Sequence, residues 1–277
     1  MTAKSPVGPS LTLSGQEQAR QGWAIQAVRQ YFQALMAHWG PQDWWPAYTR
    51  LEVIVGAFLT QNTSWKNVEG ALRNLRQHRL LNLNGLRKAS TRELEAAVRP
   101  AGYFRQKAQR LKDFVSFLDT GYGGSLTRMF SRPTAELRTE LLGLNGVGPE
   151  TADSILLYAG GHPVFVVDAY TRRVFERHGI LTGKEKYEGV RELFERAFDG
   201  QPAGDWLAGN IPPVSPLQAR RRHKLTLTEA PVEARIFDEY HALLVQVAKH
   251  HCLKKAALCD GCPLQRFLPS GPAMKRT

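Results

Sequence analysis

A glycine-containing turn and an aspartate downstream of it are the residues in this chain best suited to chemistry. Residues 144–152 read LNGVGPETA, and Gly146, Val147 and Gly148 can form a tight turn whose amide groups approach a phosphate closely. A helix that begins directly after the turn would point its positive end at the same phosphate. Asp168 ends the next apolar run. The spacing therefore predicts a backbone phosphate clamp beside one acid.

Two roles are open for Asp168. It precedes the helical start at residues 169–173, so its carboxylate can cap that helix by accepting backbone N–H groups. A carboxylate can also stabilise the positive charge that develops on a sugar when its bond to a base breaks, or activate a water molecule. Both roles can hold at once, and the sequence does not divide Asp168 between general base and electrostatic stabiliser.

The charge of the chain suits a polyanionic partner. Lys and Arg number 37 against 25 Asp and Glu, which gives a net charge of +12. We expect some of the basic residues near the turn and the acid to neutralise phosphates, although a solvated face explains any one of them. The candidates are Arg172 and Arg173, one turn beyond Asp168, and Lys107 with Arg105 and Arg110.

Three cysteines near the end of the sequence have metal-ligand spacing. They read Cys252-x6-Cys259-x2-Cys262, directly after His250 and His251. In a reducing compartment, thiols at such spacing hold metal more often than they form disulfides. Zinc held by two of these cysteines and the two histidines is one possibility.

Helical periodicity predicts an all-α fold, since no persuasive run of alternating strand residues competes with it. Residues 51–59 are apolar nearly all round, which predicts a helix buried at the centre of a bundle. We expect mobile tails at 1–18 and 269–277, and an extended or disordered insertion at 209–231 that is a solvated loop or a DNA contact. No apolar run predicts a membrane span or secretory signal, so we expect a cytoplasmic, nucleoid-associated protein. We also expect it to be a monomer.

Several segments in the same order carry a family resemblance. The turn followed by Asp168 resembles the helix-hairpin-helix, Gly/Pro, Asp (HhH-GPD) superfamily of DNA base-excision glycosylases, and the other segments follow its endonuclease III branch. Trp44, Trp45 and Pro46, together with Glu150, resemble the 3-methyladenine DNA glycosylases of the endonuclease III-like type. The similarity covers roughly residues 25–265 and leaves out the insertion. The remaining matching segments are 59–65, 98–108 and the Gly/Pro loop at 160–163.

The resemblance implies a two-lobed helix-hairpin-helix glycosylase fold. One helical lobe would span 48–160 and end in the hairpin. The second would join 19–47 to 161–268 and carry the Asp helix and the cysteines. Trp65 and Trp44 would sandwich a flipped base, with core packing as the alternative and Trp45 in the core. Gln61 would fill the gap left by the flipped nucleotide, unless it caps its helix.

Glu150 separates this chain from the family members that also cut the DNA backbone, which carry a Lys at this position. Without an amine there, no Schiff base can form, so the resemblance implies that the strand-cutting step is absent. A carboxylate also suits an N3- or N7-alkylated purine, which is cationic. A simpler explanation is that an acid in the first helical turn is favoured by the helix dipole.

The cysteine pattern departs from the family. Its iron-sulfur members continue with a fourth cysteine, where this chain has Leu268. A [4Fe-4S] cluster would therefore take Cys252, Cys259 and Cys262 with His250, His251 or water as the last ligand. A remnant that no longer binds a cluster is the next possibility, and zinc the last.

From these features we expect a monofunctional DNA N-glycosylase of base-excision repair. It would act on double-stranded DNA, flip a damaged base and hydrolyse its glycosidic bond, with 3-methyladenine as the preferred alkylated purine. The rivals are a glycosylase for mismatched thymine, uracil or adenine, an endonuclease III-type glycosylase and lyase, and a helix-hairpin-helix DNA-binding protein without catalysis.

Overall fold

The computed structural model describes residues 15–42, 47–200, 206 and 230–268. Every regular element in these ranges is a helix, and the strand-type pairing there is one isolated bridge between Cys252 and Ala257. The predicted all-α class is confirmed for this part of the chain. Three predicted features lie outside the described residues. They are the tandem Trp44 and Trp45, most of the insertion, and the tail at 269–277.

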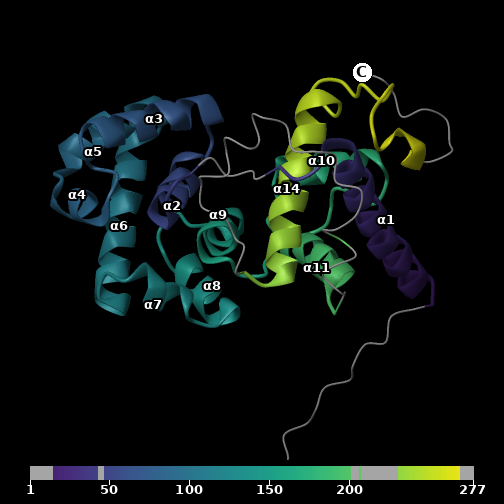
Figure 1. Ribbon diagram of the computed structural model, residues 1–277, viewed down its shortest axis with the longest axis horizontal. Coiled ribbons are helices and arrows are strands. Elements are labelled where there is room, and N and C mark those ends of the chain that lie inside the picture. Colours follow the sequence, from purple (N-terminus) through teal and green to yellow (C-terminus); the bar gives the residue numbers. More distant parts are fainter. Residues whose placement is uncertain (1–14, 43–46, 201–205, 207–229, 269–277) are drawn as a thin grey trace, which may run out of the picture.

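One group of helices contains α2 (Arg50–Leu59), which is buried along its whole apolar length as the sequence predicts (Figure 1). Helix α2 packs against the π-helical segment η2 (Ile155–Gly160), which continues α9 (Pro149–Ser154). The other members are α3 (Trp65–Gln77), α4 (Leu83–Lys88), α5 (Thr91–Val98), η1 (Arg99–Ala101), α6 (Phe104–Tyr122), α7 (Leu126–Phe130) and α8 (Thr134–Leu142).

The second group joins segments from both ends of the chain. Helix α14 (Val232–His250) packs against α1 (Gly15–Trp39) and α10 (Ala169–Arg177), and α1 also packs against α11 (Tyr187–Phe198) (Figure 1). Helix α1 begins at Gly15, so residues 15–18 form its first turn and do not belong to the predicted tail. Residues 1–14 of that tail lie outside the described residues.

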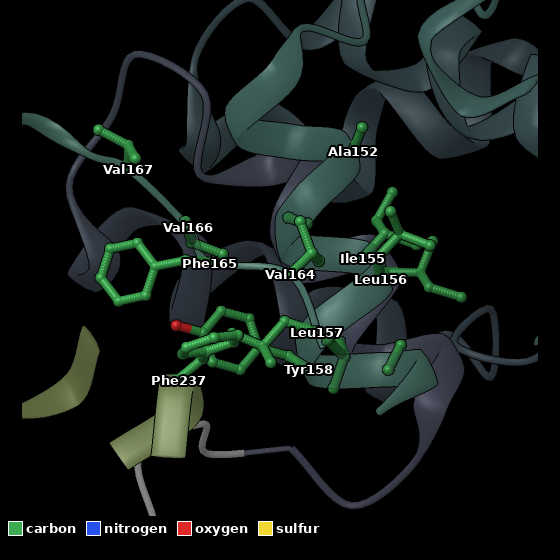
Figure 2. Packing of buried hydrophobic residues seen from close by; sticks show 14 of the residues in the cluster. Ala152, Ile155, Leu156, Leu157, Tyr158, Val164, Phe165, Val166, Val167 and Phe237 are labelled. Atoms are coloured by element: carbon green, nitrogen blue, oxygen red, sulfur yellow. The ribbon is translucent and has the colours of Figure 1, made fainter. Parts of the chain in front are cut away.

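A buried extended run connects the two groups and leads to Asp168. After η2 the chain turns at Gly161 and continues through residues 164–167, all of which are buried (Figure 2). Phe165 of this run stacks on Phe194 of α11 and meets Phe237 of α14 edge-on. This packing fixes the end of the run, so the position of Asp168 is set by the core of the second group.

A buried ion pair also joins the groups. Arg138 of α8 pairs with Asp153 of α9 at 2.6 Å and with Glu188 of α11 at 2.8 Å. Asp153 has no exposed surface, so its charge depends on this partner. Helix α9 is thereby held against the second group.

Candidate functional site

The predicted turn forms at the N-terminus of α9. Gly146 lies in the left-handed region with φ 75°, and the Arg110 side chain occupies the space that a Cβ there would need. The Val147 N–H donates to the Leu144 carbonyl at 3.1 Å, and the Val147 side chain is buried. Val147 therefore closes the turn, which corrects the expectation that its amide binds phosphate.

Gly148 has a different environment from Gly146. It is the N-cap of α9 with φ −92°, a conformation that any residue adopts, and a Cβ there would have no neighbour within 4 Å. The fold therefore does not require glycine at this position. The open space lies next to the first-turn N–H groups of α9, which have no partner within their own helix.

Gln61 ties the end of α2 to the turn. Its amide nitrogen donates to the Gly146 carbonyl at 3.0 Å and to the Thr151 hydroxyl at 2.9 Å, and its oxygen accepts from Arg110. A Gln61 side chain that entered a DNA duplex would give up these three bonds. The role as a plug stays a prediction.

Lys107 is a clear correction to the sequence analysis. Only 1% of it is exposed, and its ammonium donates to the carbonyls of Leu59 at 2.9 Å and Ala101 at 2.7 Å. It joins the end of α2 to η1 and does not face a phosphate. Burial, followed by the charge of Arg110, lowers the pKa of Lys107 to about 8.

Arg173 has a structural role, and its predicted phosphate contact stays a prediction. Its guanidinium donates to the carbonyls of Cys252 at 2.7 Å and Ala248 at 3.2 Å, at the end of α14. Arg172 donates to the Glu185 carbonyl at 3.0 Å, and its predicted DNA contact stays a prediction. One turn further along α10, Arg177 donates to the Leu253 carbonyl at 2.7 Å.

Asp168 is the N-cap of α10, as its position in the sequence allowed. Its Oδ1 accepts from the Thr171 N–H at 2.8 Å, and its Oδ2 lies 3.4 Å from Nε2 of His241. The side chain is 13% exposed. Burial opposes ionisation, but the charge of His241 and the bonds from His241 and Thr171 outweigh it and hold the pKa of Asp168 below its ordinary value.

Glu150 lies within electrostatic range of Asp168. Glu150 as a whole is accessible to solvent. The surrounding protein nevertheless removes water from its carboxyl group, and this desolvation, followed by the charge of Asp168, raises the pKa of Glu150. The charge of His241 acts in the opposite direction. The hairpin helix and the Asp helix thus bring two carboxylates together, one held ionised and the other easier to protonate.

His241 and Tyr158 are the members of this cluster that sequence reasoning missed. His241, on α14, is 6% exposed, and its Nδ1 lies 2.5 Å from the Tyr158 hydroxyl of η2. His241 is separated from Tyr158 by 83 positions and lies similarly far from Asp168, without shared spacing. A histidine on the apolar helix 236–247 was the available signal.

The structure describes one of the two predicted pocket aromatics. Trp65 begins α3, is partly buried against the core, and donates from Nε1 to Glu69 at 3.0 Å. Because Trp44 lies outside the described residues, the predicted base sandwich stays a prediction.

The three cysteines lie within electrostatic range of one another, since burial and then the charges of Cys259 and Cys252 raise the pKa of the Cys262 thiol. Cys252 Sγ accepts from Arg177 at 3.2 Å, and the rings of His250 and His251 lie beside Trp39. Within the described ranges, no group of three or more His, Cys, Asp or Glu side chains is placed to hold a metal ion.

The buried Lys107 ammonium makes a testable contribution to the pH dependence of stability. The pKa of Lys107 falls from 10.5 to about 8 on folding, so the unfolded chain holds more protons between these values. The difference in free energy of unfolding, wild type minus Lys107→Met, should therefore increase as the pH rises from about 8 to 10.5. Urea unfolding across this range measures it, and a flat difference would contradict the burial of the ammonium.

Comparisons with known proteins show the family of this chain. The model of the HhH-GPD superfamily of base excision DNA repair proteins matches residues 55–199. A putative DNA repair glycosylase of Methanocaldococcus jannaschii is 41% identical over 244 residues, which cover 88% of this chain and 96% of that protein.

Solved structures share the fold. The Helicobacter pylori 3-methyladenine DNA glycosylase bound to 1,N6-ethenoadenine has a TM-score of 0.61 and 26% identity, over 83% of this chain and 97% of that one. A trapped endonuclease III–DNA covalent intermediate has a TM-score of 0.59 and 18% identity, over 92% and 96% of the two chains. No helix in the described ranges has the length and apolar character of a membrane span.

The match to the family model and the relative at 41% identity together show the family. The chain therefore belongs to the HhH-GPD superfamily of base excision DNA repair proteins.

Proposed function

We propose that this protein is a monofunctional DNA N-glycosylase that removes alkylated purines, 3-methyladenine above all, from double-stranded DNA. The observation that carries the proposal is the acid pair. Asp168, before the first residue of α10, is kept ionised within electrostatic range of Glu150 in the first turn of α9. The family membership and the relative from Methanocaldococcus jannaschii support the glycosylase class.

Asp168 serves the sugar in this proposal. As the bond between C1′ and the base nitrogen breaks, the electron pair leaves with the base and positive charge develops on the sugar. An ionised carboxylate beside C1′ stabilises that charge. Water then adds to C1′, and its proton passes to Asp168 or to solvent.

Glu150 serves the base. A purine alkylated at N3 or N7 is cationic and leaves as a neutral molecule, so it needs no acid to protonate it. A carboxylate near the flipped base attracts such a purine and has no amine with which to attack C1′. The resemblance of the fold to the Helicobacter pylori 3-methyladenine DNA glycosylase supports this substrate class.

The predicted cofactor is not needed for these steps. An iron-sulfur cluster on Cys252, Cys259 and Cys262 stays a prediction, which the visible absorbance and iron content of the purified protein measure. The roles given to Asp168 and Glu150 are independent of its outcome.

Base release tests the proposal directly. Wild-type protein should release 3-methyladenine from alkylated DNA, and Asp168→Asn should lower the rate by about 10²–10⁴-fold, because the sugar cation loses its counter-charge. Chromatography of released bases measures both. The control is borohydride treatment, which should trap no covalent adduct.

Three outcomes would contradict this assignment. Release from duplexes with mismatched thymine, uracil or adenine but not from alkylated DNA would point to another lesion. A borohydride-trapped adduct would point to a lyase. Binding without release of any base, unchanged by Asp168→Asn, would point to a non-catalytic DNA-binding protein.

Glu150 should select for charge on the base. Glu150→Gln should lower the rate of 3-methyladenine release by about tenfold, since one favourable ion pair is lost. Because the pKa of Glu150 is raised, the wild-type advantage over Glu150→Gln should shrink as the pH falls. Affinity for a duplex with an abasic-site analogue, which has no base, is the control and should stay unchanged. Equal losses for both duplexes would indicate a role in DNA binding instead.

The two glycines of the turn should respond differently to substitution. Gly148→Ser adds a side chain in open space at a position where serine caps helices well, so the melting temperature should hold. Its DNA affinity should fall roughly tenfold, because the new side chain occupies the approach to the α9 amides. Gly146→Ala should lower stability and affinity together, since it strains the left-handed turn and displaces Arg110. Unchanged affinity of Gly148→Ser would place the phosphate elsewhere.

A further inference from the structure

A chain of three polar groups crosses the core where the two helix groups meet. The Tyr158 hydroxyl lies 2.5 Å from Nδ1 of His241, and Nε2 of His241 lies 3.4 Å from Oδ2 of Asp168. Each group comes from a different element, namely η2, α14 and the start of α10. Tyr158 and His241 are both less than a tenth exposed.

This arrangement is costly inside the protein, since buried polar groups lose their hydration. Capping of α10 does not require it, because Oδ1 of Asp168 already accepts the Thr171 N–H. The contact with His241 engages the second carboxylate oxygen. The two contacts together set both the charge and the rotation of the carboxylate.

Tyr158 keeps the imidazole in one orientation in either charge state. A hydroxyl can donate to Nδ1 when His241 is neutral and accept from Nδ1–H when it is protonated. In both cases Nε2 carries a proton, and this nitrogen lies 3.4 Å from Oδ2 of Asp168. The attraction to Asp168 is stronger when His241 is charged.

We propose that His241, held by Tyr158, is a positioning residue that keeps Asp168 ionised and fixes the direction of its carboxylate. This inference rests on the proposed glycosylase function for its catalytic meaning. The proton that Asp168 takes from water must leave before the next turnover. A protonated His241 beside the carboxyl favours that loss.

Other titratable groups surround the trio and enter its pH dependence. Glu150 of α9 interacts with both Asp168 and His241. Burial and the nearby acids keep the phenols of Tyr158 and Tyr187 neutral, by raising their pKa values. The charged neighbour on α14 itself is Asp238, which acts on Tyr158.

The test compares pH profiles of base release by the wild type, His241→Leu, His241→Gln and Tyr158→Phe. The acid limb is the part of the profile in which kcat falls as the pH is lowered. We expect it to lie about one pH unit or more higher in His241→Leu, because Asp168 then protonates more easily. His241→Gln keeps a donor without the charge and should shift the limb less than His241→Leu. Tyr158→Phe should shift it in the same direction by the smallest amount.

The chain offers a matched control in the same helix group. Nδ1 of His178 lies 2.7 Å from the Tyr31 hydroxyl, and among the described contacts His178 makes no ion pair with a carboxylate. His178→Gln should lower stability as any buried change does, yet leave the acid limb in place. An unmoved limb in His241→Leu, or an equal shift in His178→Gln, would overturn the proposal.

If the wild type releases no base at all, the proposed function fails. A stability measurement then still tests the pairing of Asp168 with His241. Urea unfolding of Asp168→Asn, His241→Leu and the double variant gives the coupling between the two side chains. We expect Asp168→Asn to change the unfolding equilibrium about tenfold less in the His241→Leu background than in the wild type. Additive effects would overturn the pairing whatever the activity.

Discussion

The structure depends on keeping one carboxylate charged where water is largely excluded. Asp168 sits at the end of a buried run, and burial alone would favour its neutral form. The N-terminus of α10 offsets part of that cost, and His241 on α14 offsets more. Because His241 needs Tyr158 to hold its ring, η2 must also pack against this place. Helix α14, which lies far along the sequence, must therefore pack against both η2 and α10, and its contacts with these two elements satisfy that requirement.

Positively charged side chains hold the turn before α9 from inside the protein. Lys107 joins the end of α2 to η1 through two carbonyls, and Arg110 covers Gly146 while donating to Gln61. These side chains hold the turn in shape at the N-terminus of α9. An excess of Lys and Arg therefore overstates the charge available to a polyanion, because a buried ammonium stabilises the fold and releases no counterion from DNA. The turn presents backbone N–H groups in place of those charges.

Sequence reasoning succeeded where a feature is local. The helical periodicity, the glycine turn and the capping position of Asp168 each depend on residues within a few positions, and all three appear in the structure. It failed where the partner lies far along the chain. Nothing near Lys107 reveals that its ammonium donates to the carbonyl of Leu59, 48 positions away, and charge alone favoured phosphate. His241 escaped notice for the same reason, since its partners lie 83 and 73 positions away.

Helix α10 is fastened at both ends by different means. Its start is held by the Asp168 network, and its later turns are held by Arg173 and Arg177, which bind main-chain carbonyls of the segment after α14. Main-chain carbonyls are present whatever side chains the segment carries. The cysteine segment can therefore exchange its side chains during evolution while its attachment to the Asp helix is preserved. A change in the cysteines, and with it any capacity to bind a metal, therefore need not alter the position of the helix that carries Asp168 at its start.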